Sequence, residues 1–159
     1  MAANDPTTGE PLASSPASQW VVFSCERHLL GVPVGQVREI VPGRRTTRIP
    51  GCGEEVAGLV NLRGGVVTVF DLGAALRLRA AAVLPEHLLL VLEREARPAA
   101  LAVDHVLAVA HTPPEGLAVR QEALHALDVA AADVLGVGDW DGRAFVALDA
   151  ATLMERLWG

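Results

Sequence analysis

The chain has 159 residues, a formal net charge of −6 and 51% hydrophobic residues. This length fits one domain or two small ones, and the apolar content is enough to form a core. All 13 basic residues are arginines, which excludes a Schiff-base lysine and the lysine of a P-loop. The acidic balance argues against a nucleic-acid-binding protein, which needs a basic face.

Residues 1–18 differ from the rest of the chain, because they are rich in Ala, Ser, Thr and Pro and carry two charges. We expect this tail to be disordered and residues 19–159 to form the folded domain. The chain contains no window of 18 apolar residues, and its N-terminus lacks the features of a secretory signal. A cytoplasmic protein without direct membrane insertion is therefore predicted.

The first half of the folded part alternates apolar runs with turn signals. It predicts strands over 20–25, 29–34, 56–62 and 66–70, turns at 26–28 and 63–65, and a helix over 72–78. Asp71 precedes this helix and can cap it by accepting hydrogen bonds from backbone N–H groups of its first turn. Between the second and third strands, Val34, Val37 and Ile40 extend the apolar pattern up to Pro42.

The second half of the chain repeats this order of elements. It predicts strands over 88–92, 99–103, 106–110, 135–140 and 144–148, then a helix capped by Asp149 that ends near Trp158. Positions Val34, Val37 and Ile40 recur 69 residues later as Val103, Val106 and Val109, and Gly58, Gly64 and Asp71 recur 78 residues later as Gly136, Gly142 and Asp149. The constant offsets indicate an internal duplication and two similar small β-barrels.

Residues that could carry chemistry are few and poorly arranged. Cys25 and His28 lie on either side of a predicted turn without a third, orienting residue, and Cys25 and Cys52 form no C-x-x-C motif. The five histidines do not show the i, i+4 spacing of a helical metal site. The positive evidence for an enzyme is weak, and we expect no catalytic residue, cofactor or metal. A small thiol or metal enzyme remains an alternative, whereas an oligonucleotide-binding barrel would need a basic groove lined with aromatic residues.

A local basic cluster, Arg44, Arg45 and Arg48, precedes Ile49 and Pro50. Taken alone, this cluster predicts a solvated loop between strands.

An ordered set of motifs resembles the CheW family of bacterial chemotaxis coupling proteins. The set begins with Val34, Val37, Glu39 and Ile40. It continues with residues 58–64, which read Gly-Leu-Val-Asn-Leu-Arg-Gly, and with residues 69–72, which read Val-Phe-Asp-Leu. The family usually has Pro where this chain has Thr68; because Thr favours strands and supplies a backbone donor, we expect the strand to persist.

The resemblance implies a mainly β fold of two interleaved, SH3-like five-stranded barrels that share a hydrophobic core, with short helices after the last hairpin of each barrel and a C-terminal helix. It also implies a non-catalytic adaptor that couples the cytoplasmic tip of methyl-accepting chemoreceptors to the regulatory domain of the histidine kinase CheA. Such a protein would approach the membrane only through receptor arrays. A CheW-like adaptor for another output, such as gliding or development, is the alternative within this class.

The resemblance assigns Val37, Glu39 and Arg63 to the receptor-contact segments of the family. Arg63 offers a planar fork for a carboxylate or carbonyl, and Glu39 could pair with a receptor cation or with Arg63 itself. Gly58, Gly64 and Asp71 are interpreted as structural turn residues. Val37 and Ile40 are expected to lie partly in the core and partly in a groove, and the kinase contact is expected to use apolar residues at the end of a barrel.

Overall fold

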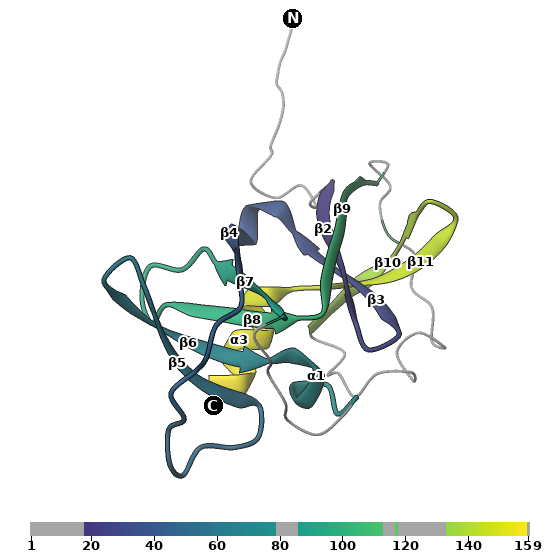
Figure 1. Cartoon of the computed structure of the whole chain (residues 1–159). Coiled ribbons are helices and arrows are strands. Elements are labelled where there is room, and N and C mark those ends of the chain that lie inside the picture. Colours follow the sequence, from purple (N-terminus) through teal and green to yellow (C-terminus); the bar gives the residue numbers. More distant parts are fainter. Residues whose placement is uncertain (1–17, 79–85, 113–116, 118–132, 159) are drawn as a thin grey trace, which may run out of the picture.

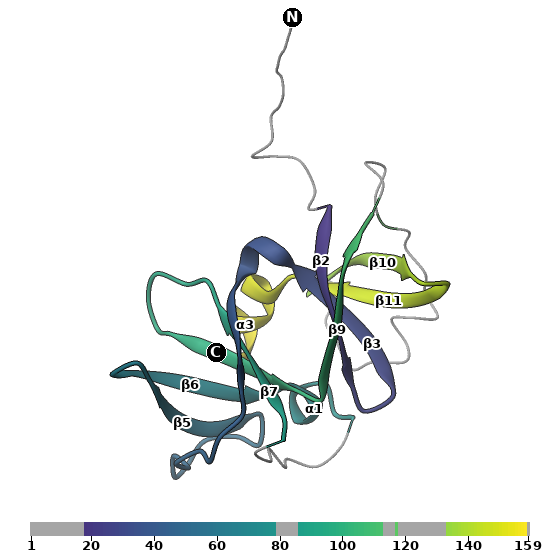
Figure 2. The same cartoon turned by 45° about the horizontal axis from the view of Figure 1, so that its top comes forward.

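The structure is a computed structural model that describes residues 18–78, 86–112, 117 and 133–158. Almost all of the predicted disordered tail, residues 1–17, lies outside the described residues. The remaining chain forms two five-stranded sheets with few helices (Figures 1 and 2), which confirms the mainly β, two-subdomain prediction.

The first sheet combines strands from both ends of the described chain. In spatial order its strands are β10 (Val134–Trp140), β11 (Arg143–Leu148), β3 (His28–Pro33), β2 (Gln19–Cys25) and β9 (His105–His111). β11 runs parallel to β3, and the other neighbours are antiparallel.

The second sheet has the same arrangement. In spatial order its strands are β4 (Val37–Pro42), β7 (Leu88–Leu92), β8 (Ala99–Val103), β6 (Gly65–Asp71) and β5 (Val56–Leu62). β6 runs parallel to β8, as β11 does to β3. Helices follow each hairpin: α1 (Leu72–Ala75) after β6, and α3 (Ala150–Trp158) after β11.

The duplication predicted from the sequence is visible in the register of the strands. Val37 pairs with Leu92 in the second sheet, and Val106 pairs with Phe23 in the first, so that both members of the pair shift by 69 residues. The pairing also shows that each half of the chain contributes to both sheets, with two strands in one sheet and three in the other. β4 follows β2 and β3 but joins the second sheet, whereas β9 follows β7 and β8 but joins the first.

The connection between β3 and β4 carries out this change of sheet. A short 3-10 helix, η2 (Val34–Gln36), occupies the segment between the two strands. The helix predicted over 72–78 is shorter than expected. It ends at Ala75, and Arg77 adopts a φ of 58° that turns the chain out of the helical path.

Buried side chains form one core shared by both sheets and one further cluster on each sheet. The shared core contains Phe23 and Leu30 from the first sheet, Phe70 and Leu101 from the second, and Leu153 from α3. α3 therefore contributes its apolar side to the space between the sheets, and its C-terminal Trp158 packs edge-on against Phe70 with ring centroids 5.1 Å apart.

The cluster of the first sheet depends on two glycines. Phe145 lies so close to Gly31 of β3 and Gly138 of β10 that an added Cβ would come within 2.8 Å and 2.5 Å of its ring, respectively. Trp20 packs beside Phe145 at a centroid distance of 6.3 Å, and its indole N–H donates to the Thr112 hydroxyl. The missing side chains at Gly31 and Gly138 thus provide the room for a large ring.

Candidate protein-interaction surface

Glu39 and Arg63 lie on opposite edges of the second sheet. Glu39 is on β4, immediately after a bulge between Val37 and Glu39 in the pairing with β7. Arg63 is in the two-residue turn that joins β5 to β6. The guanidinium Nη1 of Arg63 lies 2.6 Å from Oε2 of Glu39, so an ion pair connects the two edges.

The backbone of the hairpin fixes the position of Arg63. Arg63 and Gly64 have φ values of 52° and 81°, as the two central residues of a type I′ turn require. The Gly64 N–H donates to the side-chain oxygen of Asn61 at 3.0 Å. The sequence Asn-Leu-Arg-Gly therefore builds a tight turn that presents the side chain of Arg63 at its tip.

The two members of this ion pair differ in exposure. The side chain of Arg63 is 77% exposed, whereas that of Glu39 is 23% exposed. A guanidinium has five N–H donors, and the contact with Glu39 is made by one of its nitrogens. The remaining donors of Arg63 can therefore bind a carboxylate or carbonyl while Glu39 orients the group.

A second contact between the edges of the second sheet lies in the segment that follows β4. Thr47 and Leu59 of β5 form an antiparallel bridge with two N–H···O bonds of 2.8 Å. Gly58 makes this approach feasible, because its φ is 143° and a Cβ there would overlap the backbone carbonyl of Thr47. Gly58 thus serves the close packing of two backbone segments.

Arg38 precedes Glu39 and makes a separate exposed ion pair. Its Nε and Nη2 donate to the two carboxylate oxygens of Glu93 at 3.2 Å and 3.0 Å. This bidentate hydrogen bonding, together with the opposite charge, raises the pKa of Arg38 and lowers that of Glu93. Arg38 is consequently oriented toward the end of β7, whereas Glu39 is oriented toward the β5–β6 turn.

The two capping aspartates occupy equivalent positions but differ in their partners. Asp71 is buried and accepts from the Ala74 N–H at 3.3 Å. Asp149 accepts from the N–H groups of Ala151 and Thr152 and also from the Gln36 amide at 3.0 Å. Burial acts to raise the pKa of Asp149, but these hydrogen bonds outweigh it and lower the pKa.

Gln36 was not recognised from the sequence. Its side-chain oxygen accepts from the Ala150 N–H at 2.7 Å while its amide donates to Asp149. Its backbone carbonyl accepts from the Glu93 N–H at 2.9 Å. One polar residue of η2 thereby joins the start of α3 to the end of β7, a long-range role that no local sequence signal could have indicated.

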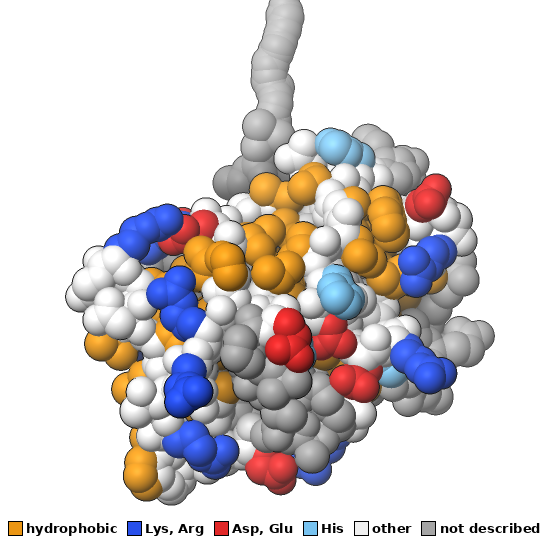
Figure 3. Space-filling model, viewed as in Figure 1, with side chains coloured by type: hydrophobic (Ala, Val, Ile, Leu, Met, Phe, Trp, Pro, Cys, Tyr) orange, Lys and Arg blue, Asp and Glu red, His pale blue; other side chains and the backbone are white. Residues whose placement is uncertain are grey.

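Exposed apolar side chains lie on β4 and on β9. β4 exposes Ile40, and β9 exposes Leu107 and Val109, while Val37 is half-buried. Figure 3 shows hydrophobic side chains gathered between the regions of β4 and β9. The sequence singled out Ile40 and Val109 only as members of a repeated apolar pattern, and Leu107 only as part of the strand predicted over 106–110.

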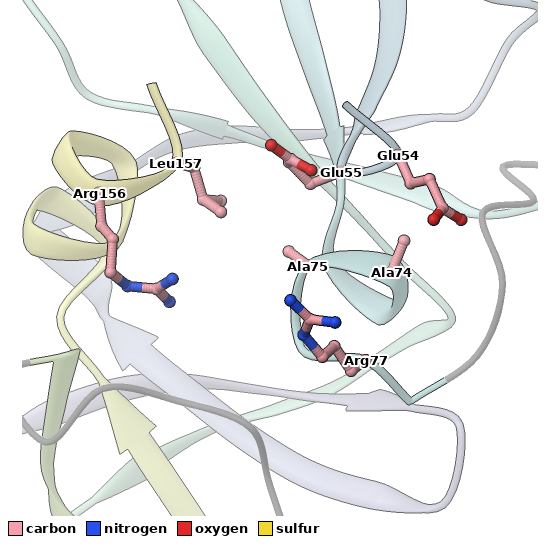
Figure 4. A pocket seen from close by; sticks show the side chains of 7 residues that line it. All are labelled: Glu54, Glu55, Ala74, Ala75, Arg77, Arg156 and Leu157. Atoms are coloured by element: carbon pink, nitrogen blue, oxygen red, sulfur yellow. The ribbon is translucent and has the colours of Figure 1, made fainter. Parts of the chain in front are cut away.

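A hollow of about 490 Å³ lies elsewhere, between α1 and α3 (Figure 4). The residues that line it are Glu54, Glu55, Ala74, Ala75, Arg77, Arg156 and Leu157. This lining offers no thiol, hydroxyl or imidazole group, and Arg156 already contacts the buried Asp133 at 2.7 Å. The charged groups that line the hollow are thus the carboxylates of Glu54 and Glu55 and the guanidinium groups of Arg77 and Arg156.

The candidate thiol and metal residues are dispersed. Cys25 lies in the shared core, whereas Cys52 is exposed and distant in the chain. In the part of the chain that the structure describes, no group of three or more His, Cys, Asp or Glu residues could hold a metal ion. Among the same residues, no helix is both long and apolar enough to span a bilayer.

Comparison with known proteins places this fold in a family. The model of the CheW-like domain matches residues 19–157, which is nearly all of the chain beyond the tail. The chain belongs to the CheW-like domain family. The resemblance inferred from the motifs is therefore confirmed.

A solved structure and a curated relative support the assignment. The scaffolding protein TtCheW from Thermoanaerobacter tengcongensis superposes with a TM-score of 0.74 at 23% identity, over 92% of this chain and 93% of that one. Protein PilI of Pseudomonas aeruginosa is 27% identical over 120 residues, which cover 74% of this chain and 67% of PilI. The chain thus has a CheW-like scaffold fold, and the family assignment is consistent with a non-catalytic role.

Proposed function

We propose that the chain is a non-catalytic adaptor that couples chemoreceptors to the histidine kinase CheA. The observation that carries this proposal is the match of the CheW-like domain over residues 19–157. In this role, the receptor tip contacts Val37, Glu39 and Arg63, and the regulatory domain of the kinase binds a different face. The protein acts in the cytoplasm and is held near the membrane by the receptor array.

The geometry of the ion pair supports this assignment of the receptor contact. Arg63 stands at a turn with most of its side chain in solvent, and Glu39 fixes one of its nitrogens. An oriented guanidinium loses less conformational entropy on binding than a free one. The exposed side chains of Ile40 on β4 and of Leu107 and Val109 on β9 supply apolar area, as a protein interface requires.

The proposal is tested by measuring binding to two purified partners, a receptor cytoplasmic tip and the CheA regulatory domain. Binding to both, with Arg63→Ala weakening only the receptor interaction, is the expected result. A matched control is Asp141→Ala, because Asp141 occupies the equivalent turn of the β10–β11 hairpin with a φ of 54°. If the wild-type protein binds neither partner, the proposal is wrong.

A second candidate is an adaptor of the same kind for a non-flagellar output, such as gliding or development. The similarity to a curated protein named PilI, at 27% identity, favours retaining it. The receptor and kinase genes adjacent to this one, and the motility phenotype of a deletion strain, distinguish the two outputs. A swimming defect with normal surface motility would contradict the second candidate.

A further inference from the structure

The segment between β4 and β5 contains three arginines that the function proposed above does not use. Arg44, Arg45 and Arg48, here called the arginine stripe, are all exposed, and residues 40–53 contain no acidic residue. Arg44 donates to the backbone carbonyl of Asn61 at 3.2 Å. Within the described ranges, none of the three has a carboxylate within ion-pair distance, in contrast to Arg38, Arg63 and Arg156.

The backbone that carries the stripe is held along β5. The Thr47–Leu59 bridge fixes its centre, and the Thr46 hydroxyl donates to the carbonyl of Ala57 at 3.3 Å. These contacts hold the guanidinium groups on an ordered support, so a partner does not have to order the segment itself. Preorganisation of this kind lowers the entropic cost of binding.

The arginine stripe is continuous with the surface that contains Arg63. Arg44 binds the carbonyl of Asn61, two residues before Arg63, so the stripe begins beside the β5–β6 turn. Figure 3 shows basic side chains following one another down the side of the molecule where β4 and its following segment lie. A partner that contacts Arg63 therefore has the stripe within reach.

We propose that the arginine stripe docks a carboxylate-rich segment of a protein partner. An anionic membrane or a nucleic acid covers a wider area than the stripe, and each of its charges acts over about one Debye length, about 8 Å at physiological ionic strength. It would therefore also be repelled by acidic residues around the stripe, such as the exposed Glu54 that follows it in the chain. A short acidic protein segment meets mainly the three local positive charges. Arginine also suits carboxylates because its planar fork can donate two parallel hydrogen bonds.

This inference rests on the proposed function only for the identity of the partner, a chemoreceptor tip or the kinase regulatory domain. The charge effect itself does not depend on that identity. It is measured first with a fluorescein-labelled poly-L-glutamate peptide, and then with the two protein partners. Vesicles containing phosphatidylglycerol serve as the membrane comparison.

Two double variants with the same change in net charge provide the test. Arg45→Gln with Arg48→Gln removes two charges from the stripe without breaking a contact to another described residue. Arg27→Gln with Arg143→Gln is the matched control, because both residues are exposed and lie in turns or strand ends of the first sheet. Thermal unfolding of both doubles checks that the fold is preserved.

The stripe double is expected to weaken peptide binding about tenfold at low ionic strength, and the control double less than about twofold. The difference should shrink at about 0.15 M salt, where exposed charges are screened. Equal losses in both doubles would show a general charge effect and overturn the proposal. The proposal would also be overturned if the wild type bound the vesicles more tightly than the peptide and this vesicle binding were lost in the stripe double.

The protein partners separate this inference from the proposed function. If the stripe double slows association with the receptor tip or the kinase domain and the control does not, the inference is supported. If the wild type binds these partners and both doubles bind equally well, the stripe proposal fails while the proposed function stands. If the wild type binds neither partner, the proposed function fails, and the peptide comparison alone decides on the stripe.

Discussion

The two sheets share one topology but fill their separate clusters differently. In the first sheet, Phe145 lies over Gly31 and Gly138, and Trp20 packs beside it. At the corresponding places, displaced by 69 or 78 residues, the second sheet has Leu89, Val67, Ala100 and Val60. Two large rings and two glycines thus stand where four aliphatic residues of intermediate size stand in the second sheet, which teaches that the duplicated backbone constrains the total volume more than the individual side chains.

The sheets also differ in the charges that their edges carry. Glu39 and Arg63 of the second sheet correspond to Ala108 and Asp141 of the first. An ion pair therefore connects β4 to a hairpin in one copy and has no equivalent at the same positions in the other. The duplication has thus kept the strand and the hairpin in both sheets, whereas the candidate receptor contact belongs to the second sheet.

The largest expected effect comes from filling the space beneath Phe145. Gly138→Val, which introduces the residue of the second sheet, should lower the free energy of unfolding by about 3 kcal/mol because the ring has to move. Urea unfolding monitored by tryptophan fluorescence measures the change.

The combined substitution Trp20→Leu, Phe145→Val, Gly31→Ala and Gly138→Val provides the control. It installs the whole set of the second sheet and should recover most of the loss. Full recovery is not expected, because the Thr112 hydroxyl would lose the indole N–H that donates to it. If the combined variant is less stable than Gly138→Val alone, the two clusters are not alternative solutions for the same volume.

The next effect concerns the edge contact of the second sheet. Gly58→Ala should destabilise the protein by about 2 kcal/mol, since it combines an unfavourable φ with a collision against the Thr47 carbonyl. Thermal unfolding provides the measurement. Gly35→Ala is the control, because a Cβ at Gly35 meets nothing within 4 Å, and a comparable loss there would contradict the role given to the Thr47 contact.

A smaller effect is expected at the cap of α3, where Asp149 also accepts a hydrogen bond from the Gln36 amide. The pKa of Asp149 is lower in the folded protein than in the unfolded chain, so its ionised form stabilises the fold. This contribution is complete above the unfolded pKa, near 4, and is lost as the pH falls through the lower folded pKa.

Asp149→Asn should therefore flatten the decline of stability in acid, and its cost at neutral pH should stay below about 1 kcal/mol because Asn also caps helices. Gln36→Ala should flatten this decline in part, since the Gln36 amide donates one of the hydrogen bonds to Asp149. Unfolding midpoints at a series of pH values test both variants. An unchanged acid decline in Asp149→Asn would show that other carboxylates dominate.

The smallest expected change in stability accompanies a large change in binding. Arg63→Ala and Glu39→Ala should alter the free energy of unfolding by no more than about 0.5 kcal/mol, because exposed ion pairs contribute little. Both should weaken receptor binding, and Glu39→Gln should retain part of it by keeping a hydrogen-bond acceptor for Arg63. A large drop in the melting temperature of either alanine variant would instead assign the pair a structural role.

Local signals explain why so much of the fold could be predicted. Turn residues such as Gly64 and Gly142 mark the hairpins, and Asp71 and Asp149 mark the helix starts, because each acts on its own immediate backbone. The constant offsets of 69 and 78 residues then indicated that the second half of the chain repeats the elements of the first. Interleaving of the two subdomains was expected, but not which strands join which sheet, since an alternating apolar pattern shows which face of a strand is buried but not the sheet to which it belongs.

The surface was predictable to a lesser degree. The motif resemblance singled out Glu39 and Arg63, but their separation of 2.6 Å depends on closing the second sheet from β4 to β5. The contribution of Gln36 and the seating of Phe145 on two glycines depend on residues more than 100 positions apart in the chain, as in the pairs Gln36–Asp149 and Gly31–Phe145. Such contacts leave no periodic trace in the sequence.

The exchange of strands between the sheets also sets an order in which the molecule is finished during synthesis. The second sheet has all its strands once residue 103 has been made, whereas the first sheet still lacks β9, β10 and β11 at that point. The hairpin of β2 and β3 is therefore synthesised first, but the strands that pair with it in the first sheet belong to the last third of the chain. The second sheet, which carries Glu39 and Arg63, can therefore be completed before the first sheet, which then packs against it.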